Sequence, residues 1–278
     1  MKFEKCLLAS DIDGTLMEHD YISPRNFSAI EYFVSQGGTF CLSTGRCTPA
    51  IDHIVSQFKN LTHSIVYNGG MIYDYIKDKP VFENLLCEED KGFFKYLLEN
   101  IPEMGVEVYC GRDIYLLNHN VPCQVHCDYE HLKPKLVSYD DISGLNWNKA
   151  MCMYYAGFDE SRIEKLINEY EFVDSDFTKA AFELDGVRYR GYEQLPKGAH
   201  KGYGLKKMGE LLGIKEGCTF AIGDYFNDAE MLKQADISAC PKDSPQEIKD
   251  IVDFVGCSCS DGTVADFIEY LSKTIQSS

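Results

Sequence analysis

The chain has 278 residues, of which 45% are hydrophobic and 26% charged, so one large globular domain or a core with an inserted second domain is expected. Its formal net charge is −17, from 27 basic and 44 acidic residues. This balance argues against nucleic acid or an anionic membrane surface as a partner, because both attract basic proteins.

The first nine residues contain only a short apolar stretch, which is too short for the core of a signal peptide. No other apolar run approaches the roughly 20 residues that a membrane helix needs. We therefore expect a cytoplasmic protein with no membrane partner. Its 12 cysteines are then expected to be reduced thiols.

The first 83 residues alternate buried-type strands with amphipathic helices. We predict strands over residues 6–10, 39–43 and 64–67, and helices that begin at Ser23-Pro24 and Thr48-Pro49. Ser and Thr are common helix caps, and Pro fits the first turn of a helix.

The same alternation returns in the last third of the chain. We predict a helix over residues 201–212, a strand over 218–222, and helices over 245–252 and 264–271. Strands that alternate with helices of this length are typical of parallel βαβ units. The fold class is therefore predicted to be α/β, with a doubly wound, Rossmann-like parallel sheet.

The middle of the chain has a different pattern. It mixes short β-rich stretches (106–110, 114–118, 151–158 and 180–184) with helices, such as one over 161–170 whose Ser161 and Glu164 are predicted to form a capping box. We interpret residues 86–189 as an inserted α+β cap domain. Residues 1–85 and 190–278 then form the core.

The strongest functional signal, Asp11-Ile12-Asp13-Gly14-Thr15, directly follows the first predicted strand. A simple turn would explain one Asp-Gly pair, but not a second carboxylate at this spacing. Residues i and i+2 of an extended chain project to the same side, so Asp11 and Asp13 are predicted to face one reacting group. One aspartate can attack a phosphoryl group, while the other protonates the leaving alcohol and later accepts a proton from water.

Complementary groups follow other predicted strands or begin helices. Thr44 and Arg46 close the second strand with a hydroxyl and a cation, although a turn role for Thr44 is an alternative. Lys201 stands at a helix start, where the macrodipole disfavours a cation, so an anion nearby is indicated. The alternative for Lys201 is a solvated surface charge.

A second acidic segment, residues 221–228, follows the strand predicted at 218–222. Asp224 and Asp228 offer carboxylate oxygens, which suit Mg²⁺, with no thiol or imidazole beside them. Asn227 or Asp228 is also predicted to cap the helix that follows. Both roles can hold together.

These four segments, in this order, resemble those of the haloacid dehalogenase superfamily of phosphatases, and most closely its Cof-type sugar-phosphatase branch. Asn68-Gly69-Gly70 resembles that branch's Asn-Gly-Ala, and residues 260–264 resemble its C-terminal Asp-Gly segment. The sequence departs from the branch at Tyr225-Phe226, where Ser-x is commoner, and at residues 239–242, where Gly-Asn-Ala is usual.

The resemblance implies a role for each matching residue. Asp11 would be the nucleophile and Asp13 the acid and base, while Thr44 would bind the phosphoryl group and Lys201 would neutralise its charge. The resemblance also implies contacts to substrate or phosphate for Arg46, Asn68, Gly69 and Asn227. The implied ligands of Mg²⁺ are Asp11, Asp13 (through its carbonyl), Asp224 and Asp228.

The predicted function is Mg²⁺-dependent hydrolysis of a small phosphorylated metabolite, such as a sugar phosphate, through a phospho-aspartate. One alternative is a phosphomutase of the same superfamily, which would require a bisphosphorylated activator. Another is a non-catalytic metabolite-binding protein, which would release no phosphate.

A cluster of soft ligands in the predicted cap raises one further alternative, a zinc site. His119, Cys123, His126, Cys127 and His131 are close in sequence, but their spacing matches no standard zinc finger. Reduced thiols and surface histidines are the favoured interpretation.

Overall fold

The protein is described here by a computed structural model, which covers residues 1–275. The chain divides into two compact units. The first, called the core unit, contains Met1–Arg46, Asp52–Phe82 and the C-terminal segment from Ala199. The second, called the inserted unit, contains Cys47–Ile51 and Glu83–Gly198.

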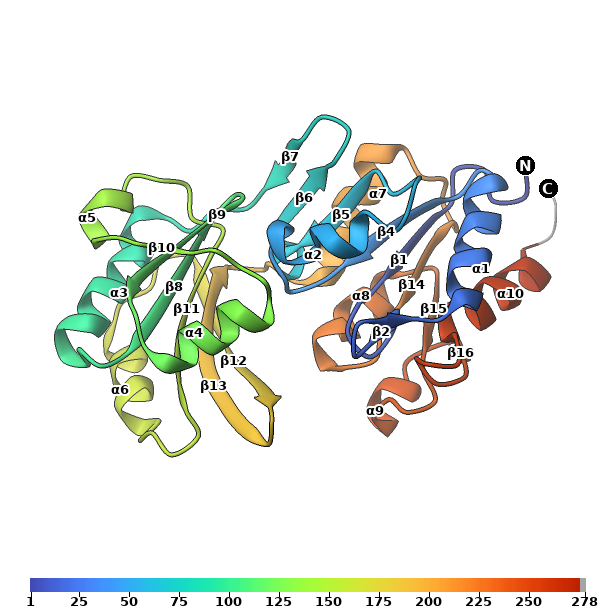
Figure 1. Cartoon of the computed structure of the whole chain (residues 1–278). Coiled ribbons are helices and arrows are strands. Elements are labelled where there is room, and N and C mark those ends of the chain that lie inside the picture. The colour runs from blue at the N-terminus through green and yellow to red at the C-terminus, as the bar shows by residue number, and fades with distance from the viewer. Residues whose placement is uncertain (276–278) are drawn as a thin grey trace. The chain divides into compact units, whose positions relative to one another are not determined.

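The core unit is built on an eight-stranded sheet, which confirms the predicted α/β class (Figure 1). Its strands are parallel from β16 to β5, and β6 is antiparallel to β5. In order across the sheet, the strands are β16 (Phe254–Val255), β15 (Ile237–Cys240), β14 (Thr219–Ile222), β1 (Leu7–Ser10), β4 (Thr39–Ser43), β5 (His63–Val66), β6 (Met71–Asp74) and β7 (Lys79–Glu83).

Strand β1 lies at the centre of this sheet, between β14 and β4. Leu8 pairs with Phe220 on one side and with Phe40 on the other, and all three side chains are buried. Strands covered on both faces read as continuous apolar runs, which is why residues 6–10 and 39–43 could be recognised from sequence.

Helices cover the sheet of the core unit. One hydrophobic cluster joins Leu7 and Ala9 of β1 to Leu205 and Met208 of α7 (Lys201–Leu212), and it includes residues of α8 (Ala229–Gln234) and α9 (Gln246–Lys249). Helices α1 (Pro24–Ser35) and α10 (Thr263–Thr274) lie side by side (Figure 1). The remaining elements are the hairpin of β2 (Met17–Glu18) and β3 (Tyr21–Ile22), and the short 3₁₀ helices η1 (Tyr67–Gly69) and η2 (Phe226–Asp228). Helix α2 (Thr48–Val55) begins in the segment Cys47–Ile51 of the inserted unit and ends in the core unit.

The predicted ends of the strands in the core unit agree with the structure to within one residue. Two predicted helices differ: α10 (Thr263–Thr274) continues three residues beyond the predicted end at 271, and α9, predicted over 245–252, spans only Gln246–Lys249. The chain leaves the helix there since Asp253 binds the backbone N–H of Ser238 with its carboxylate, at 2.8 Å, just before β16 begins. Local pattern did not reveal this long-range hydrogen bond.

The inserted unit contains a six-stranded sheet with helices α3 (Glu88–Asn100) and α6 (Ser161–Glu169) on one face. Helix α4 (Val121–Tyr129) contacts β8 and β11 of this sheet, and α5 (Tyr139–Ile142) is a single turn. The strand order is β10 (Lys135–Leu136), β9 (Asp113–Asn118), β8 (Gly105–Cys110), β11 (Lys149–Tyr155), β13 (Val187–Pro196) and β12 (Ser175–Leu184).

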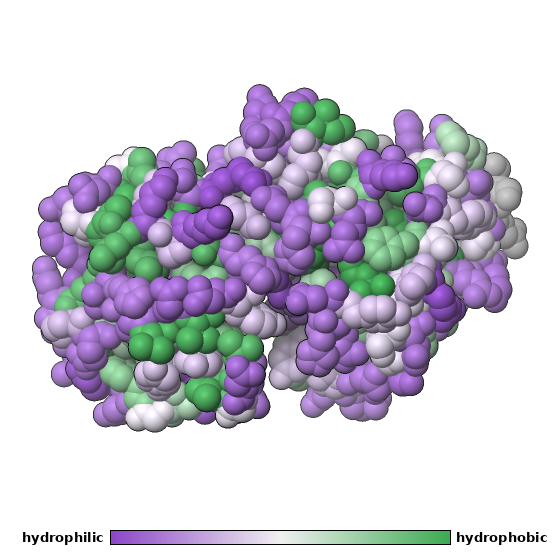
Figure 2. Space-filling model, in the orientation of Figure 1, coloured by the Kyte–Doolittle hydropathy of each residue, from purple (hydrophilic) through white to green (hydrophobic). Residues whose placement is uncertain are grey.

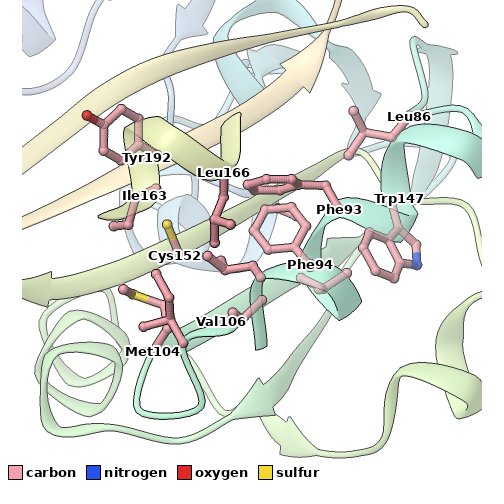
Figure 3. Packing of buried hydrophobic residues seen from close by; sticks show 14 of the residues in the cluster. Leu86, Phe93, Phe94, Met104, Val106, Trp147, Cys152, Ile163, Leu166 and Tyr192 are labelled. Atoms are coloured by element: carbon pink, nitrogen blue, oxygen red, sulfur yellow. The ribbon is translucent and has the colours of Figure 1, made fainter. Parts of the chain in front are cut away.

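Aromatic side chains fill the core of the inserted unit. Figure 3 shows Phe93 and Phe94 of α3 beside Leu166 of α6 and Val106 of β8. The single tryptophan, Trp147, is fully buried at the edge of this cluster, and its indole N–H donates to a backbone carbonyl at 2.8 Å. Burial of such large rings supplies much of the stabilisation of a unit this size.

The inserted unit differs from the sequence-based expectations in strand bounds, since β11 ends at Tyr155 and β12 begins at Ser175, and in two further details. Ser161 and Glu164 do not form a capping box, because the Ser161 hydroxyl donates to Asp159 and the Glu164 carboxylate accepts from Lys179 and Tyr192. The chain was also expected to return to the core at residue 190, whereas β13 stays paired with β12 as far as Pro196.

The visible surface is mostly hydrophilic, with apolar residues in small patches (Figure 2). Within residues 1–275, the helices are all too short or too polar to cross a membrane. The twelve cysteines are free thiols in the structure.

Candidate active site

The candidate site lies at the carboxyl ends of the central strands of the core unit. Asp11 follows β1, Thr44 follows β4, and Asp224 stands two residues after β14. Because β1 is parallel to both neighbours, these strand ends meet at the same edge of the sheet. Open α/β sheets bind their ligands at this edge.

Lys201, the first residue of α7, is the positive centre of the site. Its Nζ lies 2.5 Å from Asp11 Oδ1 and 2.6 Å from Asp228 Oδ1, and all three residues are buried. Burial alone disfavours the ammonium form. The Asp11 and Asp228 carboxylates outweigh that effect and raise the pKa of Lys201, so Lys201 is a buried cation rather than a solvated surface charge.

Asp228 anchors the loop that carries Asp224. One of its carboxylate oxygens binds Lys201, and the other accepts hydrogen bonds from the backbone N–H groups of Asp224 and Tyr225, each at 3.1 Å. Asp228 also precedes α8, in the N-cap position. Its side chain thus binds the loop before α8 rather than the first turn of that helix.

Asp224 completes a group of three carboxylates. Oxygens of Asp11, Asp224 and Asp228 lie within 4.8 Å of one another. Burial, together with the charge of Asp228, raises the pKa of Asp224 to about 6 and also raises the pKa of Asp11. The Thr15 hydroxyl donates to Asp224 Oδ1 at 3.1 Å, and this contact was not foreseen although Thr15 is part of the first motif.

The three carboxylates fit a hard divalent cation. They present oxygen atoms only, which is the ligand type that Mg²⁺ prefers, and thiol and imidazole groups are absent from this group. Burial, and after it the charge of Asp228, raises the pKa values of Asp11 and Asp224, and the charge of Lys201 does not offset this. A bound cation would stabilise the ionised carboxylates.

Asp13 and Arg46 form an ion pair beside this group. The Arg46 guanidinium donates from Nε to Asp13 Oδ2 at 2.9 Å and from Nη2 to Oδ1 at 2.7 Å. The Arg46 side chain is 11% exposed, against 52% for Asp13. Two residues predicted to act on the substrate therefore bind each other in this structure, in the two-bond geometry that arginine favours with carboxylates.

Thr44, Asn68 and Gly69 shape the adjoining loops. The Thr44 hydroxyl accepts from the Arg46 backbone N–H at 3.1 Å, so its own proton can be donated to another acceptor. The Asn68 backbone N–H donates to the Thr44 carbonyl at 3.0 Å. At Gly69, with φ of +91°, a side chain would collide with the carbonyl oxygen of His200 just before α7, so glycine lets η1 approach α7.

Asn227 is exposed on η2, and the described residues give it no hydrogen bond or ion pair. Its predicted contact with substrate or phosphate therefore stays a prediction.

The histidines and cysteines of the inserted unit do not converge on a metal site. His126 Nδ1 lies 2.9 Å from Glu107 Oε2 in a buried ion pair, and His119 binds Gln124. Within the described part of the chain, Asp11, Asp224 and Asp228 are the only such group with ligand atoms this close. The zinc alternative therefore has no support here. The Glu107–His126 pair itself was not visible in the sequence pattern.

Comparison with known proteins places the chain among phosphatases. Residues 8–268 match the family of haloacid dehalogenase-like hydrolases. Phosphatase YwpJ of Bacillus subtilis is 25% identical, over 95% of this chain and 99% of its own length. The 5-amino-6-(5-phospho-D-ribitylamino)uracil phosphatase YwtE of the same organism is 27% identical, over 96% and 98%. The solved structure of a subclass IIB sugar phosphatase has a TM-score of 0.75 at 17% identity, over 95% of this chain and 98% of that one.

Proposed function

The chain belongs to the haloacid dehalogenase-like hydrolases, as its motifs predicted, and we propose that it is a cytoplasmic, Mg²⁺-dependent phosphatase of a small metabolite. The observation that carries this proposal is the buried contact of Lys201 with Asp11 and Asp228, next to Asp224. This arrangement provides a carboxylate nucleophile, a fixed cation for the phosphoryl charge and oxygen ligands for a metal.

In the first step, a carboxylate oxygen of Asp11 attacks phosphorus, and the bond from phosphorus to the metabolite's oxygen breaks. The departing oxygen takes a proton from Asp13. In the second step, the oxygen of a water molecule attacks phosphorus, its proton goes to Asp13, and the bond between phosphorus and Asp11 breaks. Each step thus needs one proton transfer at Asp13, in opposite directions.

Other side chains of the core unit would hold the phosphoryl group. Lys201 would bind its oxygens with the ammonium that now lies between Asp11 and Asp228, and Thr44 would donate its hydroxyl proton. Arg46 binds both carboxylate oxygens of Asp13, so at least one of these two hydrogen bonds is expected to open when Asp13 transfers a proton. Phosphate is itself a good two-bond partner for arginine, which makes Arg46 a phosphate ligand in this proposal.

The carboxylates of Asp11 and Asp224 and the carbonyl of Asp13 would hold Mg²⁺, with Asp228 supporting the loop. When bound, the ion would offset negative charge on the phosphoryl oxygens. Asp228 has both oxygens engaged, by Lys201 and by two backbone N–H groups, so we assign it to the loop rather than to direct metal binding.

Two relatives support the proposed substrate class. One is a sugar phosphatase and another acts on a phosphorylated ribityl compound. We therefore propose a phosphorylated sugar or sugar alcohol derivative as substrate, with the inserted unit in the role of the cap predicted from sequence.

The test compares wild-type protein with Asp11→Asn on a panel of phosphate esters. The amide cannot attack phosphorus, so turnover should fall on the order of 10³-fold or more. Asp243→Asn, at an exposed position of the core unit, should retain full activity. Chelation should abolish turnover, Mg²⁺ should restore it, and Ca²⁺, which prefers more ligands at longer distances, should restore it poorly.

Several results would contradict the proposal. Asp11→Asn that retains a tenth of wild-type activity would remove Asp11 from the role of nucleophile. Full activity in excess chelator would remove the metal. A strict requirement for a bisphosphorylated activator would favour the phosphomutase alternative.

A further inference from the structure

Two large aromatic side chains follow Asp224 and lie open to solvent. Tyr225 is 55% exposed and Phe226 is 52% exposed. Their ring centroids are 5.0 Å apart at an angle of 74°, which is a favourable edge-to-face contact. The two rings therefore form one joined apolar surface, which we call the aromatic pair.

The backbone of the aromatic pair is fixed to the charged site. The Tyr225 N–H donates to Asp228 Oδ2 at 3.1 Å, and the Asp228 N–H donates back to the Tyr225 carbonyl at 3.0 Å. Asp228 in turn binds Lys201 through its other carboxylate oxygen, at 2.6 Å. A short chain of hydrogen bonds thus holds the base of both rings at a set position beside the carboxylates.

The aromatic pair also differs in chemistry from the rest of the site. Asp11, Asp224, Lys201 and Thr44 offer charges and hydroxyl groups, which suit a phosphoryl group and a cation. The rings offer mainly flat apolar surface, which suits an uncharged ring. Joined apolar surface left exposed beside a polar site is typical of a place where a ligand binds.

We propose that the aromatic pair binds the leaving group of the substrate, and that this leaving group carries a flat aromatic ring. The proposal rests on the phosphatase function described above and narrows its substrate class. The phosphoryl end of such a substrate would lie at Lys201, and its ring would contact Tyr225 and Phe226.

The test uses two substrates that share one ester, riboflavin phosphate and ribitol phosphate. Both carry phosphate on a ribityl chain, and only the first bears a ring. Wild-type protein should prefer riboflavin phosphate in kcat/KM by about tenfold or more, as expected for a ring stacked on protein aromatics. In the double variant Tyr225→Ser, Phe226→Ser this preference should fall to about two-fold or less, because riboflavin phosphate loses its contact.

Tyr32→Ser is the matched control. Tyr32 is 43% exposed on α1 in the same unit and makes an edge contact with Phe3, so Tyr32→Ser removes one exposed ring that is not part of the aromatic pair. It should leave the ratio of the two kcat/KM values unchanged. Esters that turn over slowly can be ranked by their inhibition of nitrophenyl phosphate hydrolysis.

Two results would overturn the inference. One is a wild-type protein with no preference for riboflavin phosphate. The other is a double variant that loses both substrates equally, which would mean that the rings contact protein instead of the leaving group. If wild-type protein releases no phosphate even from nitrophenyl phosphate, the phosphatase function fails separately. Calorimetric binding of the two ribityl esters would then still measure the ring preference.

Discussion

Replacing Asp224 with Asn should stabilise the metal-free protein at neutral pH, although it removes a group proposed to bind the metal. Burial and the nearby charge of Asp228 raise the pKa of Asp224 from 3.8 to about 6. The folded protein therefore holds this carboxylate in its ionised form at a cost. Asn has nearly the same shape, carries no charge, and can still accept the hydrogen bond from Thr15.

The size of the effect follows from the pKa difference between folded and unfolded chain. Below pH 3.8 the carboxyl group is protonated in both states and costs nothing. As the pH rises, the unfolded chain ionises first, so the cost grows until the folded pKa of about 6 is passed. The difference between a pKa of 3.8 and one of about 6 is worth on the order of 3 kcal/mol, and about half of that is present at pH 5.

The assay is urea unfolding of Asp224→Asn and wild type in chelator, at pH 7.5 and at pH 5. Far-ultraviolet circular dichroism is needed, because the single tryptophan, Trp147, lies in the inserted unit and does not report the core unit. Asp243→Asn, at an exposed position of the core unit, is the control and should change the free energy of unfolding by less than about 0.5 kcal/mol.

Asp224→Asn should be more stable than wild type by about 1–3 kcal/mol at pH 7.5, and by about half as much at pH 5. Saturating Mg²⁺ should reverse the order, because only the wild type gains the full stabilisation of ion binding. A variant that is less stable than wild type in chelator would refute the reasoning. A gain that is equal at both pH values would also do so, since it could not come from the ionisation of Asp224.

Three further predictions concern other charged groups. Asp13→Asn should lose about 10²–10⁴-fold in turnover rate on alkyl phosphates but much less on nitrophenyl phosphate, with a burst of about one nitrophenolate per site. Equal losses of rate on both substrates, with no burst, would show that Asp13 does not transfer the proton. Lys201→Met should lower the free energy of unfolding, measured in urea, by about 3–5 kcal/mol, because it leaves buried carboxylates unpaired. Lys207→Met, which removes a surface ion pair, should lower it by less than about 1 kcal/mol. Similar losses in the two variants would mean that the buried contact is unimportant. Burial opposes the charged form of His126, but the Glu107 carboxylate outweighs burial and raises the pKa of His126. The stability lost in His126→Gln should therefore be largest below pH 6.5 and should shrink as the pH rises through the raised pKa. Urea unfolding followed by Trp147 fluorescence would measure this loss, and a loss that does not change with pH would contradict the prediction.

The fold was predictable from sequence where local pattern and burial agree. Strand β4 and helix α7 have the predicted bounds, because each has a continuous apolar run or stripe and an unambiguous end. The pattern failed where a distant contact decides the structure. Helix α9 ends early at an Asp253–Ser238 hydrogen bond, and the Ser161 hydroxyl turns to Asp159 instead of capping α6.

The candidate site was predictable as a set of residues but not as a set of contacts. Asp11 and Asp13 were expected to face one group, on the assumption that the chain stays extended. Strand β1 ends at Ser10, and turn hydrogen bonds to the Ile12 carbonyl follow. The two carboxylates therefore bind different cations, Lys201 and Arg46.

Local sequence pattern could not predict the contacts between segments that are far apart in the chain. The sequence showed a lysine at a helix start, but neither its depth nor its second partner, Asp228. The Glu107–His126 pair was hidden for the same reason, since one residue lies on β8 and the other on α4. Periodicity gives the face on which a residue lies, and only the packed structure gives its neighbour.

The central place of β1 has a consequence for the order in which the protein can fold during synthesis. Its partner β4 is translated soon after it, but its other partner, β14, follows much later, and 190 residues separate Asp11 from Lys201. The long segment from Glu83 to Gly198 can fold on the ribosome before β14 emerges. Until then one edge of β1 stays open, and Asp11 stays in water without its buried cation. A growing chain therefore carries an unpaired apolar strand, prone to association, but no working nucleophile.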